Sequence, residues 1–454
     1  MKNKTINLLN GNLFKNIFLF SLPLVLTNIL QVFFHMADVA VVGRFSGPTA
    51  LGAVGSTATL VSLFTGFLIG LGSGINVCIA KYIGQGDKKR VSQTVHTAFL
   101  LTIIVGLVLM AVGELFSRKL LEMLGTKSEL IAGAELYMRY FFAAVPGVAI
   151  YNYGNAVFSS MGDTKKPLII LSISGVINVI LNLVFVIVFD MSVEGVALST
   201  FISQYISSGL LILLLFKSKS ICALRFKEIK IYKSRIKELL KLGVPSGFQH
   251  ALFAIANLFI QSGVNSLDTV MVEGNSAAIN ADALIFDIMA AFYVACSTFI
   301  GQNHGANNKE RVLKSFYICL LYSFTVSAIL GGLLMIFARQ FLSAFTTSEA
   351  VMDAGVKRIM LMGWAYCFSA FMDTATAASR GLGKTLIPTI IVISGVCVFR
   401  IVWVKTVFAY YNTYESLYLL YIFSYVITSI PELIYFAYIY KKTYSSKEKI
   451  NGQI

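Results

Sequence analysis

Long apolar runs separated by short polar stretches dominate this sequence, and they constrain its fold more than any other feature. An apolar run of about 18 residues or more predicts a membrane-spanning helix, because about 20 helical residues cross the hydrocarbon core of a bilayer. Only 13% of the 454 residues are charged, whereas a soluble protein carries roughly a quarter. A soluble core could not bury so many runs, so we expect an all-α integral membrane protein.

Twelve transmembrane helices are expected from the apolar lengths and from the Gly, Pro or charged residues that interrupt them. The expected spans are 13–42, 50–80, 92–113, 130–158, 167–190, 193–216, 242–268, 276–301, 312–337, 355–379, 386–410 and 416–440. Several spans exceed the length that a bilayer requires, which predicts tilted or kinked helices. Pro23, Pro146 and Pro245 lie inside spans, where each removes a backbone donor.

The basic residues lie mainly on one side of this arrangement. The chain has 37 Lys and Arg residues and a net charge of +15. Most of them fall in the two terminal segments and in the connectors after even-numbered spans, which share one side of the membrane. Because Lys and Arg concentrate in cytoplasmic loops, both termini are expected in the cytoplasm. This bias explains the basic charge without a nucleic-acid partner.

An internal repeat divides the chain into two halves. Residues 20–31 match 242–253, residues 80–91 match 297–312, and residues 160–170 match 381–391, at offsets of 222, 217 and 221. Each half holds six spans, so the halves share one orientation and are expected to form two pseudo-symmetric six-helix bundles.

Three regions are expected in a monomer: an N-terminal bundle at 1–216, a cytoplasmic basic linker at 217–241 and a C-terminal bundle at 242–454. The basic residues of the linker predict a solvated tether that carries topology charge. A lipid-facing amphipathic helix is the alternative.

Polar side chains inside the N-terminal spans are the candidates for an ion site, because an intramembrane ionisable group is costly and commonly functional. Asp38 lies deep in the first span, and Gln31 lies seven residues before it on the same helix face. The other candidates are Tyr137, Asn152, Asn155, Asn178, Asn182 and Thr200. A network of these groups around Asp38 would tune its proton affinity or, with Asn178, supply oxygens to Na⁺. The alternative role of such residues is interhelical contact.

Charged residues in the C-terminal spans are more scattered; they are Asp282, Asp287, Asp373, Arg400 and Glu432. Asp287 and Asp373, together with Gln31, are candidates for substrate binding. A buried pair of Asp373 with Arg400 is the structural alternative. The six cysteines show no Cys-x-x-Cys spacing, so neither a zinc site nor a disulfide framework is expected. No organic cofactor is expected.

Other classes of membrane protein find little support in the sequence. An intramembrane enzyme would need a catalytic constellation, and neither His-Glu-x-x-His nor a Gly-x-Ser-x-Gly nucleophile turn with partners is found. A channel would show a filter loop or rings of charge. The glycine-containing segment 84–90 lacks the Gly-Lys-Ser/Thr ending of a nucleotide site. We therefore expect no enzyme and no ATP-driven module.

Seven motifs follow one another in a specific order along the two halves. They are ADVAVVGRFSGPTALGAVG (37–55), IGQGDKKRV (83–91), SSMGDTKKP (159–167), NVILNLVFVIVF (178–189), GFQHALFAIANLFIQSGVN (247–265), FIGQNHGANNKERV (299–312) and SRGLGKTLIPT (379–389). Together with the two six-helix halves, they resemble the MATE family (multidrug and toxic compound extrusion) over essentially the whole chain.

This resemblance implies a secondary active exporter in a bacterial plasma membrane. The family couples inward flow of H⁺ or Na⁺ to efflux of small amphipathic, often cationic organic compounds. A lipid or polysaccharide-precursor flippase of the same broad fold is the alternative. A major-facilitator transporter also has two six-helix halves, but its usual Gly-x-x-x-Asp-Arg-type loop is not seen in 83–91.

The resemblance also implies roles for single residues. Asp38 matches the acidic residue of the family's N-terminal cation site, and a helical carboxylate of some branches is matched by Asp373. The polar residues around that cation site are matched by Tyr137, Asn152, Asn155, Asn178 and Thr200. Two departures favour coupling through Asp38: Asn182 stands where many members have Asp, and Phe253 or Ala254 stands near a glutamate of another branch. The choice between H⁺ and Na⁺ stays open.

Overall fold

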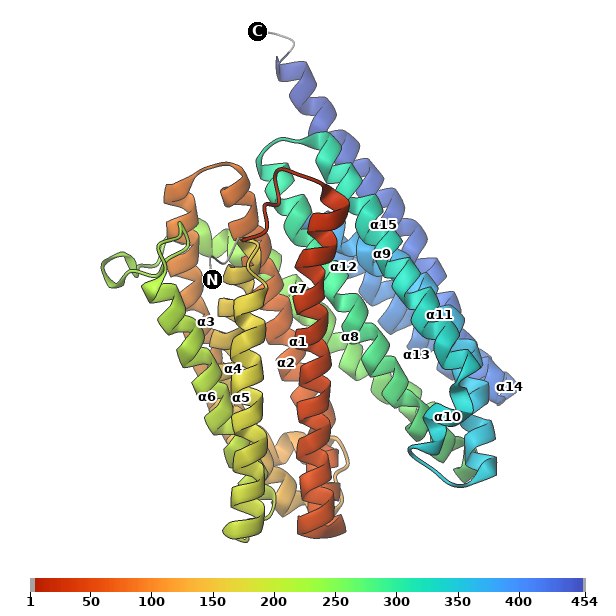
Figure 1. The fold of residues 1–454 in the computed structure, drawn as a ribbon. Coiled ribbons are helices and arrows are strands. Elements are labelled where there is room, and N and C mark those ends of the chain that lie inside the picture. The colour runs from red at the N-terminus through yellow and green to blue at the C-terminus, as the bar shows by residue number, and fades with distance from the viewer. Residues whose placement is uncertain (1–4, 452–454) are drawn as a thin grey trace. The chain divides into compact units, whose positions relative to one another are not determined.

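The computed structural model describes the backbone of residues 5–451 and side chains up to residue 445, and this part of the chain is helical without any strand (Figure 1). The long helices of the first half are α1 (Leu13–Val41), α2 (Gly47–Gly84), α3 (Lys88–Met123), α4 (Ser128–Ser160), α5 (Lys165–Leu183) and α6 (Val193–Lys217). Those of the second half are α7 (Lys233–Val264), α8 (Thr269–Gly305), α9 (Lys309–Ile336), α11 (Glu349–Gly381) and α15 (Tyr414–Asn451).

Shorter helical pieces join or extend the long helices, and the 3-10 helix η3 (Phe226–Glu228) lies between α6 and α7. A π-helical turn, η1 (Val42–Ser46), joins α1 to α2, and η2 (Val184–Val188) extends α5. The short helix α10 (Ala338–Ser343) precedes α11. The stretch Leu386–Tyr411 is a continuous succession of α12 (Leu386–Val392), η4 (Ile393–Val398), α13 (Phe399–Trp403), η5 (Val404–Phe408) and α14 (Ala409–Tyr411).

With that stretch counted as one segment, the described residues form twelve long helical segments, as expected from the apolar runs. Eight stretches are long and apolar enough to cross a membrane, and the first, Leu13–Gly84, contains both α1 and α2. The segments outside these eight are α4, α7 and α11, which contribute buried polar side chains described below. The prediction of an all-α membrane protein with twelve helices is confirmed.

Several helices begin earlier than the apolar pattern indicated because a side chain caps them. The carboxylate of Asp87 accepts a hydrogen bond of 2.9 Å from the backbone N–H of Arg90 at the start of α3. In the other half, the amide oxygen of Asn308 accepts one of 3.0 Å from the backbone N–H of Arg311 at the start of α9. An Asp or Asn cap satisfies one of the free N–H groups of the first turn. The repeat therefore extends to the caps.

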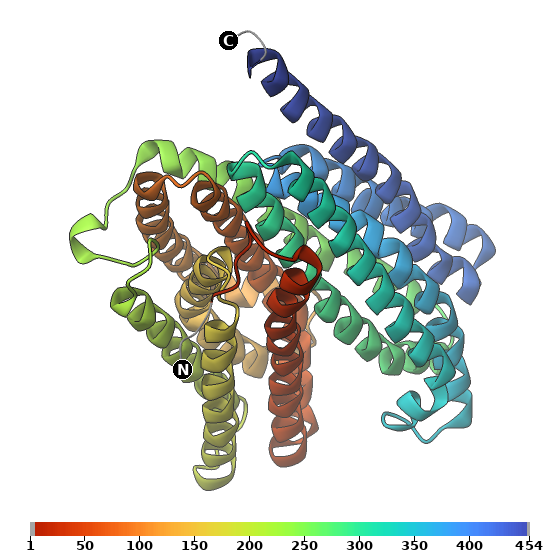
Figure 2. The same ribbon diagram turned by 45° about the horizontal axis from the view of Figure 1, so that its top comes forward.

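The chain packs into two compact units, one of which contains Leu26–Gly247. The other contains Asn7–Val25 together with the described residues from Phe248 onward. In the first unit, α4 packs against α2, α3 and α6; in the second, α11 packs against α8, α9 and α15 (Figures 1 and 2). The boundaries between these two units fall inside α1 and α7. The boundaries expected from the sequence instead lay at the ends of the basic linker. The N-terminal turns of both helices thus pack with the unit opposite to their own half.

Glycines permit the close packing of α7 on α2 inside the first unit. A Cβ atom added at Gly74 would lie 2.4 Å from the backbone nitrogen of Gly243, and one added at Gly70 would lie 2.4 Å from that of Gly247. Only residues without a Cβ allow two helix backbones to approach so closely. Close helix packing therefore explains these glycines of α2 without a ligand.

The linker 217–241 packs on α3 and is not the solvated tether that its charges predicted. Leu224 is buried, and the backbone N–H of Arg225 donates a 3.0 Å hydrogen bond to Nε2 of His96. The backbone N–H of Tyr232 donates to Oγ1 of Thr97 at 3.2 Å. Apolar residues between the lysines make these buried contacts. A count of charged residues alone could not predict them.

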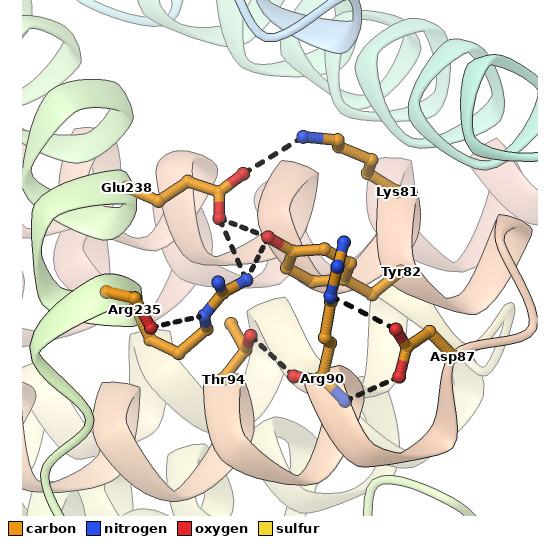
Figure 3. Close-up of polar contacts among 8 residues, drawn as sticks. Lys81, Tyr82, Asp87, Arg90, Thr94, Arg235 and Glu238 are labelled. Carbon is orange, nitrogen blue, oxygen red and sulfur yellow. Dashed lines mark hydrogen bonds and ion pairs between the residues drawn. The ribbon is translucent and has the colours of Figure 1, made fainter.

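An ion-pair cluster fastens the first turns of α7 to the end of α2 (Figure 3). The ammonium of Lys81 lies 3.0 Å from the carboxylate of Glu238, which also accepts a hydrogen bond from the hydroxyl of Tyr82. The guanidinium of Arg235 lies 3.3 Å from the other oxygen of Glu238. Three side chains from two helices therefore share the carboxylate of Glu238 and join the first turns of α7 to α2.

Candidate functional site

Asp38 of α1 forms the centre of a polar cluster in the first unit. The Nδ2 group of Asn182, on α5, donates a 2.5 Å hydrogen bond to Oδ1 of Asp38. The hydroxyl of Thr200, on α6, lies 3.4 Å from Oδ2. Three helices thus converge on one carboxylate, and both of its oxygens face a donor.

Asn178 closes this cluster from the turn of α5 before Asn182. Its Nδ2 lies 3.4 Å from the Thr200 hydroxyl, and its Oδ1 lies 3.4 Å from Nδ2 of Asn182. Residues four apart share a helix face, so Asn178 and Asn182 necessarily point the same way. We name Asp38, Asn178, Asn182 and Thr200 the Asp38 cluster.

Two features of the Asp38 cluster bear on its chemistry. Among the described residues, no Lys or Arg forms an ion pair with Asp38, so its charge has only neutral donors around it. The Oδ1 atom of Asn182 is buried without a hydrogen-bond partner, which is unusual for a buried acceptor. An uncompensated carboxylate beside a free amide oxygen can accept a proton or a small hard cation.

The other N-terminal candidates lie at different places. Tyr137 of α4 is buried and close enough to Asp38 for their charges to interact. Asn152 is fifteen residues further along the same helix, about 22 Å away at about 1.5 Å per residue. Its amide donates to the Val148 carbonyl at 2.9 Å. The Oδ1 atom of Asn155 lies 3.4 Å from the Ser159 hydroxyl. The structure therefore brings Tyr137 to the cluster and leaves these two carboxamides outside it.

The substrate candidates are divided between the two units. Gln31 is an exposed residue of α1, and Asp287 of α8 and Asp373 of α11 are partly exposed. Gln31 belongs to the first unit, while Asp287 and Asp373 belong to the second.

The ion pair of Asp373 with Arg400, which was the structural alternative to a role in substrate binding, is not formed among the described residues. Arg400 instead donates a 3.0 Å hydrogen bond from Nε to the Ser424 hydroxyl. Its guanidinium carbon lies 4.5 Å from the ring centre of Tyr421 and 4.9 Å from that of Tyr425. A guanidinium can be stabilised by aromatic faces, and the position of these rings on α15 was not apparent from the sequence.

The second unit contains a buried ion pair that was not predicted from the sequence. The guanidinium of Arg358, on α11, binds both carboxylate oxygens of Asp282, on α8, and the Tyr366 hydroxyl donates to the same carboxylate. Asp282 was recognised as charged in a span, but its partner was not. Arg358 is itself a charged residue inside an apolar span, and that signal could have identified the pair.

Comparison with known proteins places the whole arrangement in context. The MatE family model matches residues 23–184 and 245–404, one segment in each half. The probable multidrug resistance protein YoeA of Bacillus subtilis is 27% identical over 389 residues, which cover 84% of each chain. The FAD transporter of Shewanella oneidensis is 24% identical over 351 residues, covering 76% of this chain and 77% of that protein. 

The fold also matches a solved structure. A MATE-family multidrug resistance transporter of the MOP superfamily, in its outward-facing conformation, superimposes with a TM-score of 0.90. The match covers 98% of this chain and 99% of that one at 20% sequence identity. At this identity the match establishes the fold alone.

Proposed function

The chain belongs to the MATE family of membrane transporters, and from this premise we propose that it is a secondary active exporter coupled to H⁺ or Na⁺. Proteins of this family transport small molecules and are not enzymes. The proposed substrates are amphipathic, often cationic organic compounds, moved out of the cell as the coupling ion moves in. The proposed location is a bacterial plasma membrane, with both termini in the cytoplasm.

The observation that carries the coupling proposal is the Asp38 cluster. Asp38 is the one acidic residue of the cluster, and it has neutral donors in place of a basic partner. Binding a cation there removes a negative charge and alters the hydrogen bonds that join α1, α5 and α6. A ligand shifts a conformational equilibrium only by its different affinity for the two states. Helix packing that depends on the charge of Asp38 supplies such a difference.

The side chains present fit either coupling ion, with different requirements. A proton can bind Oδ2 of Asp38 without displacing the Asn182 amide from Oδ1. Na⁺ prefers oxygen ligands, as other hard cations do, and Asp38, Asn178 and Thr200 offer them. Its binding would require the Asn182 amide to rotate, which would turn the unpartnered Oδ1 toward the ion. The orientation of the Asn182 amide therefore differs between the H⁺-bound and the Na⁺-bound forms.

The test is efflux of a fluorescent cationic dye from proteoliposomes, with the Na⁺ and pH gradients imposed and collapsed one at a time. We expect one gradient to drive efflux by the wild type, and we expect Asp38→Asn to abolish it. Asp190→Asn, which changes an exposed aspartate of the same unit, is the matched control and should retain driven efflux. Wild-type rates in Asp38→Asn, with correct insertion, would refute coupling through Asp38. Transport of lipid-linked sugars without any dye transport would instead establish the flippase alternative.

A further inference from the structure

The second unit contains a buried polar cluster that the proposed coupling does not use. Its centre is Arg380, which lies near the end of α11. The Nη2 atom of Arg380 donates a 2.7 Å hydrogen bond to Oε1 of Gln249 on α7. The Thr389 hydroxyl, on α12, lies 3.4 Å from the same oxygen. Two carboxylates, Asp373 of α11 and Glu432 of α15, interact electrostatically with this guanidinium.

Glu432 is the exceptional member of this cluster. Its side chain is fully buried, with 0% exposure, and neither carboxylate oxygen has a hydrogen-bond partner. Thr376 lies beside it, but the hydroxyl of Thr376 donates to the Met372 carbonyl at 2.9 Å. An ionised carboxylate is strongly disfavoured in an apolar interior unless it is paired and hydrogen-bonded. The same unit shows the paired alternative at Asp282, which binds Arg358 and Tyr366.

Glu432 has no direct positive partner. Asp373 and Glu432 carry two potential negative charges, and the guanidinium of Arg380 interacts with both while also binding Gln249. Other titratable groups interact with members of this cluster: His250 of α7 with Arg380, Tyr293 of α8 and Arg400 of α13 with Asp373, and Tyr435 of α15 with Glu432. Ser424 and the two tyrosine rings that contact Arg400 are neutral, so its positive charge acts on Asp373. Among the described residues, no cation lies within ion-pair distance of Glu432, so its ionised carboxylate would be buried without a direct counter-ion.

A proton is the ligand that this environment accepts. Among the described residues, no group of three or more His, Cys, Asp or Glu is arranged to hold a metal ion. The Gln249 oxygen, which could serve a hard cation, is occupied by Arg380 and Thr389. A proton needs only one carboxylate oxygen and removes the unpaired negative charge of Glu432.

The internal repeat indicates that the fold does not require these charges. At the offset of 222, Gln249 and His250 correspond to Thr27 and Asn28; at the offset of 221, Asp373, Thr376 and Arg380 correspond to Asn152, Asn155 and Ser159. The first half thus builds the same helix arrangement with neutral polar side chains. Only the second half has charged residues, Asp373 and Arg380, at these positions. This difference points to a function beyond packing.

We propose that Glu432 is a proton-binding residue of the second unit, protonated from water by way of the partly exposed Asp373 and Arg380 region. The reaction is the binding of one H⁺ to one carboxylate, and Arg380 keeps its electrostatic interaction with Asp373 when Glu432 is neutral. This site is separate from the one proposed at Asp38, which belongs to the first unit. Its proton occupancy does not depend on transport.

The test is infrared difference spectroscopy of the purified full-length protein in lipid, recorded between acidic and alkaline pH. We expect a buried carboxylic-acid band that is lost at alkaline pH and is absent in Glu432→Gln. Glu415→Gln, which changes an exposed residue on the same helix, should keep the band. The band should also remain in Asp38→Asn, so failure of the coupling proposal is distinguishable from failure of this one.

Identical spectra for the wild type and Glu432→Gln would overturn the proposal, as would a wild type without any such band. Glu432→Asp provides a second variant if Glu432→Gln does not purify. It retains a carboxyl group, and the frequency of the band should shift because the acid is then an aspartic acid. An unshifted band in Glu432→Asp would assign the proton to another residue.

Discussion

The amide of Asn182 donates a 2.5 Å hydrogen bond to the carboxylate of Asp38, although 144 residues separate them in the chain. The bond joins α5 to α1 at the point where Thr200 of α6 also faces the carboxylate. Asn182 is fully buried, so its orientation is set by its neighbours. Asn182 is thus the donor closest to the carboxylate that we propose as the coupling site.

Removing that donor should impair transport. A hydrogen bond to a charged group contributes about 1.5–3 kcal/mol, and about 1.4 kcal/mol corresponds to a tenfold change. We therefore expect Asn182→Ala to lower the initial rate of gradient-driven dye efflux roughly tenfold or more. Asn155→Ala is the control, because Asn155 contacts Ser159 and not the Asp38 cluster. Equal rates for the two variants would show that the Asn182–Asp38 bond has no part in coupling.

Breaking the buried ion pair of the second unit should destabilise the protein. Removing one partner of such a pair costs about 3–5 kcal/mol, because the other charge stays buried without compensation. Arg358→Met alone should lower the thermal unfolding midpoint in detergent more than the double variant Arg358→Met with Asp282→Asn. A double variant that is as unstable as the sum of the two single variants would contradict this account.

Adding a methyl group at the α2–α7 contact should also destabilise the first unit. The new Cβ in Gly74→Ala would lie 2.4 Å from the backbone of Gly243, and forced overpacking costs about 1–3 kcal/mol. Gly55→Ala lies on the same helix with nothing within 4 Å of its Cβ, and alanine is the better helix former. The unfolding midpoint should fall for Gly74→Ala and stay level or rise for Gly55→Ala.

The ion-pair cluster at the start of α7 should stabilise the protein in a pH-dependent way. Burial alone would raise the pKa of Glu238, but the Tyr82 hydroxyl and the charges of Lys81 and Arg235 hold it below its ordinary value of 4.5. A lowered pKa gives stability that is present above the ordinary value and is lost as pH falls through the folded value. At pH 7, Glu238→Gln should cost about 1 kcal/mol, since the carboxylate is partly exposed.

The measurement for Glu238→Gln is the difference in unfolding midpoint from the wild type between pH 7 and pH 4. We expect the difference to be constant down to about pH 5 and to shrink below that. Glu310→Gln, which removes an exposed i,i+4 pair with Lys314, is the control and should show little difference throughout. A difference for Glu238→Gln that grows as the pH falls would contradict the lowered pKa.

The linker and the N-terminal segment show how far the repeat extends beyond what the sequence revealed. The carbonyl of Lys230 lies 3.4 Å from the Thr97 hydroxyl of α3, and the carbonyl of Leu8 lies 3.3 Å from Nη2 of Arg311 on α9, the counterpart of α3 in the second half. Leu8 and Lys230 are 222 residues apart, the offset of the first repeated segment. Their side chains have nothing in common, so only the backbone contacts reveal the equivalence.

The membrane class, the twelve helices and the duplication could be predicted because they follow from apolar length and from the order of polar junctions along the chain. Spacing along one helix was also sufficient to place Asn178 and Asn182 on one face, since residues four apart lie together. These are local properties of the chain, and they do not depend on which helices become neighbours.

The partners of the buried charges were decided by the tertiary structure alone. Asp38 meets Asn182 and Thr200, Asp282 meets Arg358, and Glu432 is left without a hydrogen-bond partner. Each outcome depends on the rotation and depth of helices that are distant in sequence, which no spacing encodes. A helix rises about 1.5 Å per residue, so a shift of one turn would have given Asp38 other neighbours. The residue types therefore marked the candidates, and helix packing determined which of them form a site.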